Sequence, residues 1–214
     1  MLSLSLAGVR SVVAIGAHPD DIEIGAGGLL LRLVEAVPDL TVRYVLCGGA
    51  PARQAEARAA ASAFLPYARV TFDLHDLPDG RLPGHWNRVK QIMQDAAVTP
   101  ADLVIVPSRS DAHQDHRLLG ELAITAFRDQ IVIQYEIPKW DGDLGQPNVY
   151  IPLTAEQAAR KVELLNTHFP SQKVHDWWDD EVFYGLMRLR GMESRSRYAE
   201  AFTATKLSVS IAPA

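Results

Sequence analysis

Short apolar runs alternate with longer amphipathic stretches over the first 135 residues of the chain. The apolar runs suit strands that are buried on both faces of a sheet, and they cover residues 12–17, 42–47, 68–74, 103–106 and 131–135. The stretches between them predict helices over residues 29–37, 51–64, 86–97 and 116–127. This alternation predicts a mostly parallel sheet with right-handed crossovers, a Rossmann-like three-layer α/β/α sandwich.

The pattern changes after residue 136. Residues 137–148 are rich in Pro, Gly and Asp, which predicts a long loop able to form the wall of a pocket. Helices are predicted over residues 154–167 and 179–195. Thr154 and Gln157 have the spacing of a capping box and mark the start of the first of these two helices.

Length and composition are those of one globular domain. The chain has 214 residues, of which 48% are hydrophobic and 22% charged, enough for a substantial core. No repeat or linker divides it, so we expect a single domain over 1–214, with a catalytic part over 1–136 and a substrate-specificity part over 137–214. The net charge of -5, with both signs interspersed, offers no basic face and argues against nucleic acid as a partner.

The cysteine content and the N-terminal stretch limit the kinds of metal site and the cellular location that we expect. Cys47 is the only cysteine, so an internal disulfide and a thiolate-rich zinc cage are both excluded, and any metal must use His, Asp or Glu. Residues 1–10 lack a basic leader region, and no apolar run approaches the roughly 20 residues that span a bilayer. We therefore expect a cytoplasmic protein without a transmembrane segment, and a homo-oligomer is compatible with the sequence.

A first cluster of ionisable residues follows the first predicted strand, in the sequence Ala17-His18-Pro19-Asp20-Asp21. It supplies an imidazole and a carboxylate three residues apart, with a second carboxylate between them. One of these carboxylates could bind a metal while the other acts as a general base on water. The alternative is structural, because an Asp pair before a helix can serve as its N-cap and His is a common polar residue at a strand end.

A second cluster, Asp111-Ala112-His113-Gln114-Asp115-His116, follows the fourth predicted strand. His113 and His116 are spaced i, i+3, which places both on one side of a turn at a helix start. One could be a metal ligand. The other, its ring tautomer held by Asp115 or Asp111, could donate to a developing oxyanion or a leaving amine. A solvated polar helix start is again the alternative.

The two clusters are more informative together than apart. In parallel sheets, sites lie beyond the carboxyl ends of the strands, and both clusters occupy that position. Two His and one Asp with open positions form a recognised catalytic zinc arrangement. The sequence does not prove that the clusters meet, but their combination predicts metal-assisted hydrolysis.

The order and spacing of three motifs resemble those of the PIG-L/LmbE-like family of zinc-dependent N-acetylglucosamine deacetylases. The motifs are His18-Pro19-Asp20-Asp21, Arg53-x-x-Glu56-Ala57 and Asp111-x-His113-x-Asp115-His116. Residues 77–82, 135–136, 147–150 and 198–202 are also similar to segments of that family. Gln114 departs from it, because many relatives have Pro at that place.

The resemblance implies a role for each matched residue. His18, Asp21 and His116 would bind one Zn²⁺ per chain, Asp20 would be the general base, and His113 would assist as an imidazolium held by Asp115. Arg53 would contact the substrate or brace the site, although an ion pair with Glu56 on the helix surface is an alternative. Fe²⁺ or Co²⁺ could occupy the same donor set.

The implied activity is removal of the N-acetyl group from an N-acetylglucosamine-type amino sugar or glycoconjugate. A zinc-activated water would attack the amide, and either His113 or the protonated Asp20 could give a proton to the departing amine. A metal-dependent amidohydrolase acting on another acyl amide is an alternative. A non-catalytic Rossmann-like module that binds a metabolite through Gly25-x-Gly27-Gly28 is a further one, disfavoured because that spacing is not the dinucleotide fingerprint.

Overall fold

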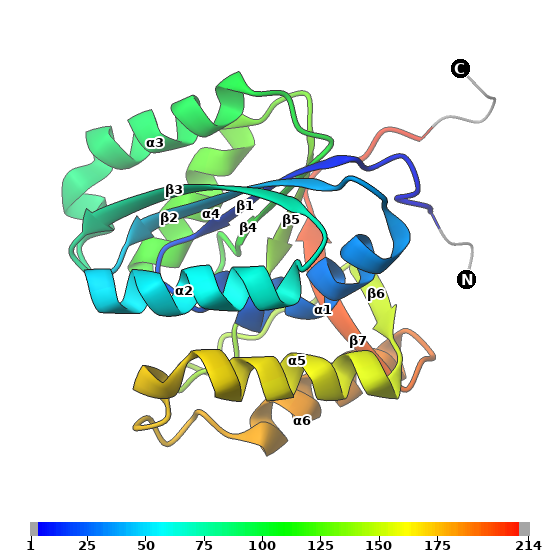
Figure 1. Ribbon diagram of the computed structural model, residues 1–214. Coiled ribbons are helices and arrows are strands. Elements are labelled where there is room, and N and C mark those ends of the chain that lie inside the picture. Colours follow the sequence, from blue (N-terminus) through cyan, green and yellow to red (C-terminus); the bar gives the residue numbers. More distant parts are fainter. Residues whose placement is uncertain (1–3, 210–214) are drawn as a thin grey trace.

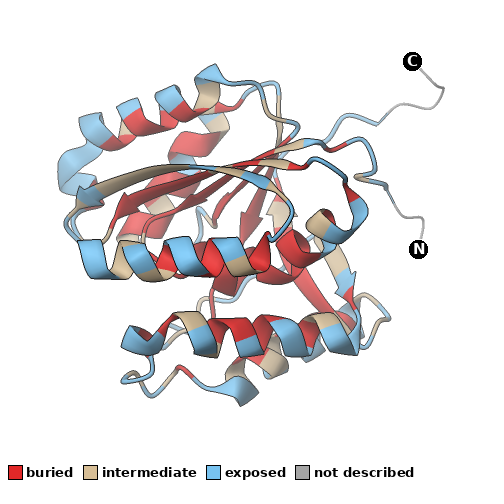
Figure 2. Ribbon diagram, in the orientation of Figure 1, coloured by how far each residue is buried: buried red, intermediate tan, exposed pale blue. Residues whose placement is uncertain are grey.

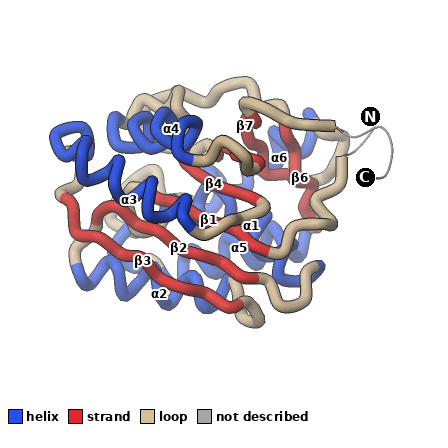
Figure 3. Tube along the Cα trace, turned by 90° about the horizontal axis from the view of Figure 1, so that it is seen from above, coloured by secondary structure: helices blue, strands red, loops and turns tan. Residues whose placement is uncertain are grey.

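A seven-stranded sheet forms the centre of the computed structural model, which describes residues 4–209 (Figure 1). The strands are β1 (Ser11–Gly16), β2 (Thr41–Gly48), β3 (Arg69–Leu77), β4 (Leu103–Pro107), β5 (Ile131–Tyr135), β6 (Val149–Leu153) and β7 (Tyr198–Ala204). They lie in the order β3-β2-β1-β4-β5-β7-β6 (Figure 3). The first five in that order are parallel and β7 is antiparallel to both its neighbours, so the prediction of a mostly parallel sheet is confirmed.

Helices cover both faces of the sheet. They are α1 (Asp21–Ala36), α2 (Pro51–Phe64), α3 (Trp86–Val98), α4 (Gln114–Ala126), α5 (Ala155–His168) and α6 (Asp180–Glu193). Figure 1 shows α3 and α4 on one face and α1 and α2 on the other, where α5 packs outside α1 and α2. The predicted capping box of Thr154 and Gln157 is present at the start of α5. Among the helices of residues 4–209, none has the length and apolar composition needed to cross a bilayer.

The core lies on both faces of the sheet (Figure 2). Successive side chains of a strand point to opposite faces. On β1, Val12 and Ala14 accordingly belong to the apolar cluster under α1 and α2. Val13 and Ile15 belong to the cluster under α3 and α4. The continuous apolar run of this strand thus reflects burial on both sides, as expected for a central parallel strand.

Two strands were not predicted from the pattern. β7 makes the only two antiparallel pairings in the described chain, with β5 and with β6, and both new strands add residues after 148 to the same sheet. Pro152 lies within β6, where it is tolerated because β6 is an edge strand with one side free of pairing. The last third of the chain therefore completes the sheet that holds the first two thirds. Residues 1–3 and 210–214 of the single domain expected over 1–214 lie outside the described residues.

Helix α1 begins earlier than predicted, at Asp21 instead of residue 29. The glycines expected to lead into the helix are inside it, and they face other elements closely. A Cβ added at Gly25 would overlap the ring of Tyr135, and one added at Gly28 would overlap Leu153 and the Glu200 carboxylate. These glycines therefore bring α1 close to the sheet, instead of forming a phosphate-binding turn.

A buried ion pair joins the last third of the chain to α1. Lys161 Nζ lies 2.7 Å from Glu200 Oε1, and both side chains are about as buried as the core. Lys161 also donates to the carbonyl oxygen of Ile24, while Glu200 accepts from the backbone nitrogens of Gly28 and Leu29. Because every partner is satisfied, the pair fixes α1 relative to α5 and β7.

We expect Gly25→Ala to lower the free energy of unfolding by about 1–3 kcal/mol, because the added methyl group overlaps the Tyr135 ring in a closely packed site. Gly185→Ala is the matched control: Gly185 also lies within a helix, but its added Cβ meets no atom within 4 Å. Alanine is the better helix former, so this control should be neutral or stabilising. Urea denaturation of both variants measures the difference, and equal stabilities would contradict the close packing of α1.

Candidate metal centre and active site

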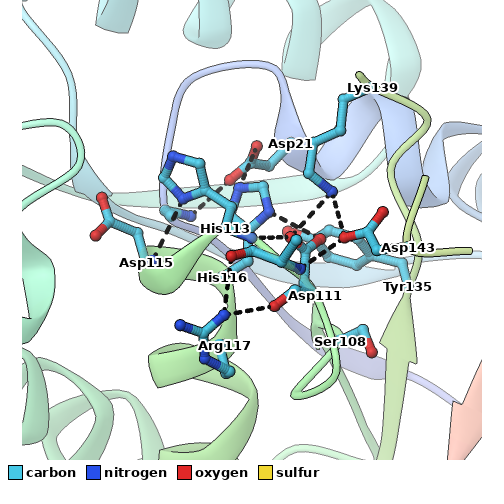
Figure 4. A network of polar contacts seen from close by, with 12 residues as sticks. Asp21, Ser108, Asp111, His113, Asp115, His116, Arg117, Tyr135, Lys139 and Asp143 are labelled. Atoms are coloured by element: carbon cyan, nitrogen blue, oxygen red, sulfur yellow. Dashed lines mark hydrogen bonds and ion pairs between the residues drawn. The ribbon is translucent and has the colours of Figure 1, made fainter. Parts of the chain in front are cut away.

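The connections that follow β1 and β4 carry the two predicted clusters. β1 and β4 are neighbouring parallel strands, so both connections leave the same edge of the sheet. His18 and Asp20 lie between β1 and α1, and Asp21 begins α1, whereas His113 precedes α4 and His116 lies in its first turn. Figure 4 shows Asp21, His113 and His116 close to one another. His18 Nδ1 lies 3.2 Å from His116 Nε2, across a sequence separation of 98 residues. The fold therefore brings the two clusters to one place.

Three side chains of these clusters present donor atoms to one another. His116 Nε2 lies 3.2 Å from His18 Nδ1 and 3.2 Å from Asp21 Oδ1, and His18 Nδ1 lies 3.6 Å from Asp21 Oδ2. Ligands held about 2.0–2.1 Å from a tetrahedral zinc ion lie roughly 3.3 Å from one another. The two contacts of His116 Nε2 match that spacing, whereas the 3.6 Å distance from His18 Nδ1 is to the other oxygen of Asp21. Two imidazoles and a carboxylate are donors of the kinds that zinc accepts.

Other groupings of potential ligands overlap this one. His18, His113 and His116 each offer an atom within 4.8 Å of the others, and so do His18, Asp79, His113 and Asp115. The rings of His113 and His116 have centroids 4.8 Å apart. All the groupings contain His18 and lie over the same edge of the sheet, which defines one centre for a cation.

Backbone contacts fix the orientation of Asp21. Its Oδ2 accepts hydrogen bonds from the backbone nitrogens of Ala17 and His18, each at 2.8 Å. Those bonds hold the carboxylate across the turn that leads from β1 into α1. The other oxygen, Oδ1, is the one that lies 3.2 Å from His116.

Asp111 orients His116 from behind (Figure 4). Its Oδ2 lies 3.0 Å from His116 Nδ1, and its Oδ1 accepts from the backbone nitrogen of His113 at 2.8 Å. Lys139 Nζ lies 2.9 Å from both Asp111 Oδ1 and Asp143 Oδ2. A carboxylate on one ring nitrogen fixes the tautomer and directs the other nitrogen to a metal.

Asp20 occupies the N-cap position of α1 without capping it. Its side chain makes no capping hydrogen bond, and its backbone has φ 129°, a value that non-glycine residues rarely adopt. The amide of Gln172, oriented with its nitrogen toward Asp20, donates to Asp20 Oδ2 at 3.1 Å. Burial, reinforced by the charge of Asp21, raises the pKa of Asp20 to about 7. The structural explanation of this carboxylate as a helix cap is therefore not supported by its contacts.

Arg53 pairs with Asp20 more closely than with Glu56. Its Nη2 lies 3.1 Å from Asp20 Oδ2 and donates to the carbonyl oxygen of Pro19, whereas its Nε is 4.0 Å from Glu56 Oε2. Glu56 instead accepts from the backbone nitrogen and hydroxyl of Ser171. Arg53 thus contacts two residues of the first cluster, Pro19 and Asp20.

Asp115 makes different contacts from those expected. Its carboxylate accepts from the backbone nitrogens of Gly80 and Leu82, and its Oδ2 lies 3.2 Å from His18 Nε2. Toward His113 it is the backbone nitrogen of Asp115 that donates, to His113 Nδ1 at 3.3 Å. A ring nitrogen that accepts is unprotonated, so the neutral His113 ring carries its proton on Nε2.

Neighbouring charges shift the pKa values of the residues in the centre. Burial opposes the ionisation of Asp21, yet the charges of His116 and His18 hold its pKa well below the usual range. Burial also disfavours charge on His116, but Asp21 and Asp111 raise the pKa of this imidazole to about 9. The pKa of His113 is lowered by burial and by the charges of His116 and His18. The carboxylates thus create a place for positive charge in a buried setting.

A cavity of about 260 Å³ opens above this centre. Ile24 and Ile137 contribute apolar surface to it, and Trp140, His175 and Trp177 line it on the side of the last third of the chain. The predicted loop over residues 137–148 therefore does form part of a pocket wall.

Several site residues were not singled out from the sequence. Asp79 lies in a segment that resembles the family, and its Oδ1 is 3.0 Å from His18 Nε2. Lys139 and Gln172 reach the site from the last third of the chain, where no spacing rule relates them to the two clusters. Their presence in the site could be recognised only from the three-dimensional structure.

The remaining histidines and tryptophans either line the cavity or lie away from it. Trp178 is 8% exposed, and its Nε1 donates to Asn166, so it belongs to the core. His85 and His168 are absent from the cavity lining, whereas His175 stacks on Trp177 with an interplanar angle of 11° at its edge. Cys47 is buried, and burial raises the pKa of its thiol to about 12, which does not suit a nucleophile.

Comparison with known proteins identifies relatives of the chain. The sequence model of one family, described as PIG-L: GlcNAc-PI de-N-acetylase, matches residues 13–127, more than half of the chain. Among curated proteins, the uncharacterized deacetylase YaiS of Escherichia coli K12 is 26% identical over 169 residues, covering 74% of this chain and 90% of YaiS.

Solved structures with the same fold include proteins of different activities. The N,N'-diacetylchitobiose deacetylase from Pyrococcus horikoshii superposes with a TM-score of 0.68 at 19% identity, over 92% of this chain and 84% of that protein. GalB, the 4-carboxy-2-hydroxymuconate hydratase from Pseudomonas putida KT2440, gives a TM-score of 0.71 at 17% identity, over 96% and 100% of the two chains. At these identities, the likeness is one of fold.

We expect protein purified without added metal, then dialysed against Zn²⁺, to hold about one divalent cation per chain, and His116→Ala to abolish this binding. Asp111→Asn should weaken zinc affinity about 10–100-fold, because it removes the charge behind His116. Inductively coupled plasma mass spectrometry and competition with a chromogenic chelator measure both effects. His85→Ala, at an exposed position outside the centre, is the control. Equal zinc in His116→Ala and wild type would place the cation elsewhere.

Proposed function

The chain belongs to the PIG-L family and is an N-deacetylase hydrolase, and we propose that it removes the N-acetyl group from an N-acetylglucosamine-type amino sugar or glycoconjugate with the help of a bound divalent cation. One observation carries the proposal: donor atoms of His18, Asp21 and His116 lie 3.2 to 3.6 Å apart beside the buried Asp20. Candidate metal ligands beside a buried carboxylate that does not cap its helix are the groups that metal-assisted amide hydrolysis requires.

His18, Asp21 and His116 would hold one cation per chain. Zinc suits two imidazoles and a carboxylate, and Fe²⁺ or Co²⁺ accepts the same donors. Such a cation, when bound, polarises an amide carbonyl and makes a nearby water more acidic. Asp111 would raise the affinity of the site for the cation, because it fixes the orientation of the His116 ring.

Asp20 would act as the general base. Arg53 and Gln172 hold its Oδ2, and the backbone geometry at this residue directs the carboxylate toward the cavity in place of a capping role. It takes a proton from water as the oxygen of that water bonds to the carbonyl carbon. When the C–N bond breaks, Asp20 returns the proton to the departing nitrogen. The products are acetate and the free amino sugar.

His113 would stabilise the oxyanion that forms during attack. The backbone nitrogen of Asp115 donates to its Nδ1, which leaves the Nε2 hydrogen available to a developing negative charge in the cavity. This role needs only the neutral ring. Asp115 would act through its carboxylate on His18 and on the loop at Gly80, as a positioning residue.

A different acyl amide is the alternative substrate. The same residues would hydrolyse a formyl or longer acyl amide, because the metal ligands and Asp20 would act on the amide group, which all these compounds share. The acid released by each compound distinguishes the two.

We expect the zinc-loaded protein to release acetate and an equal amount of free amine from at least one member of a panel of N-acetylhexosaminyl compounds. The panel contains monosaccharides, disaccharides and glycosides, with the N-formyl and N-butyryl forms of each. Mass spectrometry and an amine-reactive fluorophore quantify the products. Removal of the metal with a chelator should abolish release and added Zn²⁺ should restore it. Absence of any acid release across the panel would rule out the proposed function.

We expect Asp20→Asn to lower kcat about 10²–10⁴-fold, the usual contribution of a positioned general base. Asparagine has the same size and keeps a partner for Arg53, so the zinc content should stay at the wild-type level. Steady-state rates on the best substrate of the panel, read beside the metal content, separate loss of the base from loss of the site. A kcat within tenfold of wild type would assign the base to another residue.

A further inference from the structure

The two carboxylate oxygens of Asp20 have different surroundings. Arg53 Nη2 lies 3.1 Å from Oδ2, and the amide nitrogen of Gln172 donates to the same oxygen at 3.1 Å. Within residues 4–209, no hydrogen bond or ion pair reaches Oδ1. Asp20 also lines the cavity of the metal centre. A general base needs one oxygen free to take a proton from water, so Oδ1 is the oxygen suited to that task.

Arg53 by itself would not leave Oδ1 free. Arginine and carboxylate side chains frequently pair through two parallel contacts, which would engage both oxygens of Asp20. Here only Nη2 of Arg53 reaches Asp20, and this nitrogen also donates to the carbonyl oxygen of Pro19. Nη1 instead donates to the side-chain oxygen of Gln172 at 3.0 Å, and Nε lies 4.0 Å from Glu56. The second nitrogen that a two-contact pair needs is therefore engaged elsewhere.

The amide of Gln172 acts as acceptor and donor at once. Its oxygen accepts from Arg53 while its nitrogen donates to Asp20, so the amide lies between the guanidinium and the carboxylate. Gln172 is buried, with 5% of its surface exposed, and buried polar groups that lose a partner are costly. A carboxylate at this position would repel Asp20, and an apolar side chain would leave Nη1 of Arg53 without this acceptor.

The backbone around Gln172 is held on both sides. Gln172 ends the short helical turn η2 (Pro170–Gln172), which follows α5. Its backbone nitrogen donates to the carbonyl oxygen of Phe169 at 3.0 Å, and its own carbonyl oxygen accepts from the backbone nitrogen of His175 at 3.0 Å. The buried Phe169 packs edge to face against Trp178. The turn therefore presents the amide from a fixed backbone.

Glu56 ties this turn to the helix that carries Arg53. Its Oε1 accepts from the backbone nitrogen of Ser171 at 3.1 Å, and its Oε2 accepts from the Ser171 hydroxyl at 2.6 Å. Glu56 and Arg53 are three residues apart on α2. The two groups that contact Asp20 Oδ2, one on α2 and one on the turn, are thereby kept in a constant relative position.

We propose that Gln172 is a positioning residue that prevents Arg53 from pairing with both oxygens of Asp20, and that Glu56 holds Gln172 in place through Ser171; this inference rests on the proposed function. One oxygen of Asp20 then stays free on the side of the cavity and takes the proton from water. The last third of the chain contributes to the reaction through the orientation of the base.

A double-mutant cycle of Gln172→Met and Asp20→Asn in zinc-loaded protein tests the proposal. Gln172→Met should lower kcat about tenfold and change KM less than about twofold, because it removes a hydrogen bond to a charged group. In the Asp20→Asn background the same substitution should change kcat by less than about twofold, since Gln172 acts through the carboxylate. Ser171→Ala removes the hydroxyl contact with Glu56 and should give a smaller loss with the same background dependence.

Gln157→Met is the matched control. Gln157 lies at the other end of α5, where its side chain belongs to the capping box and donates to Glu35 at 2.6 Å. Its loss should lower the stability of this helix and leave kcat unchanged. The zinc content of every variant should equal that of wild type. A wild-type kcat in Gln172→Met, or an equal fall of kcat in both Asp20 backgrounds, would overturn the proposal.

Crystal structures of wild type and Gln172→Met give a readout without turnover. In the variant, both oxygens of Asp20 should lie within about 3.2 Å of Arg53 nitrogens, whereas in wild type only Oδ2 should do so. Acid release by wild type together with a one-contact pair in the variant would overturn the positioning role and leave the proposed function standing. A two-contact pair in the variant of a protein that releases no acid from any compound would support the positioning of Asp20 and overturn the reaction.

Discussion

The parallel pairing of β1 with β4 is the constraint on which the site depends. Because the two strands are neighbours and point the same way, the segments that follow them leave one edge of the sheet, and His18 and His116 come within 3.2 Å. Helix α1 must then begin at once, at Asp21, and lie close to the sheet, which the glycines facing Tyr135 and Glu200 allow. A bulkier α1 would move Asp20 and Asp21 away from the imidazoles.

The support of this centre comes from the whole chain. Lys139 neutralises Asp111, which orients His116, and Gln172 contacts Asp20. Both residues belong to the part expected to set specificity, and that part also completes the sheet through β6 and β7. The loop after β5 that carries Lys139 also carries Trp140, which lines the cavity, so this wall of the cavity and the position of Asp111 are physically connected.

Periodicity and local motifs were sufficient for most of the first half. Strands buried on both faces give continuous apolar runs, and the residues placed after β1 and β4 could be expected to converge because parallel strands end at one edge. β6 and β7 were not predicted because neither is a continuous apolar run: β6 contains Pro152, and β7 contains Glu200 and Thr203. The start of α1 was not predicted because glycine normally weakens a helix, and tertiary packing outweighed that preference at Gly25. The carboxylate contacts of Asp115 depend on the loop at Gly80, which no local spacing reveals.

The backbone of Asp20 has a consequence for how this protein can change. A non-glycine residue at φ 129° costs about 1–3 kcal/mol, which the surrounding contacts must supply. Glycine at position 20 would relieve that strain and remove the carboxylate. If Asp20 is the general base proposed above, selection for thermal resistance alone would favour a well-folded protein without activity, whereas selection for turnover would keep the strained aspartate. The most active and the most stable members of a lineage need not be the same sequences.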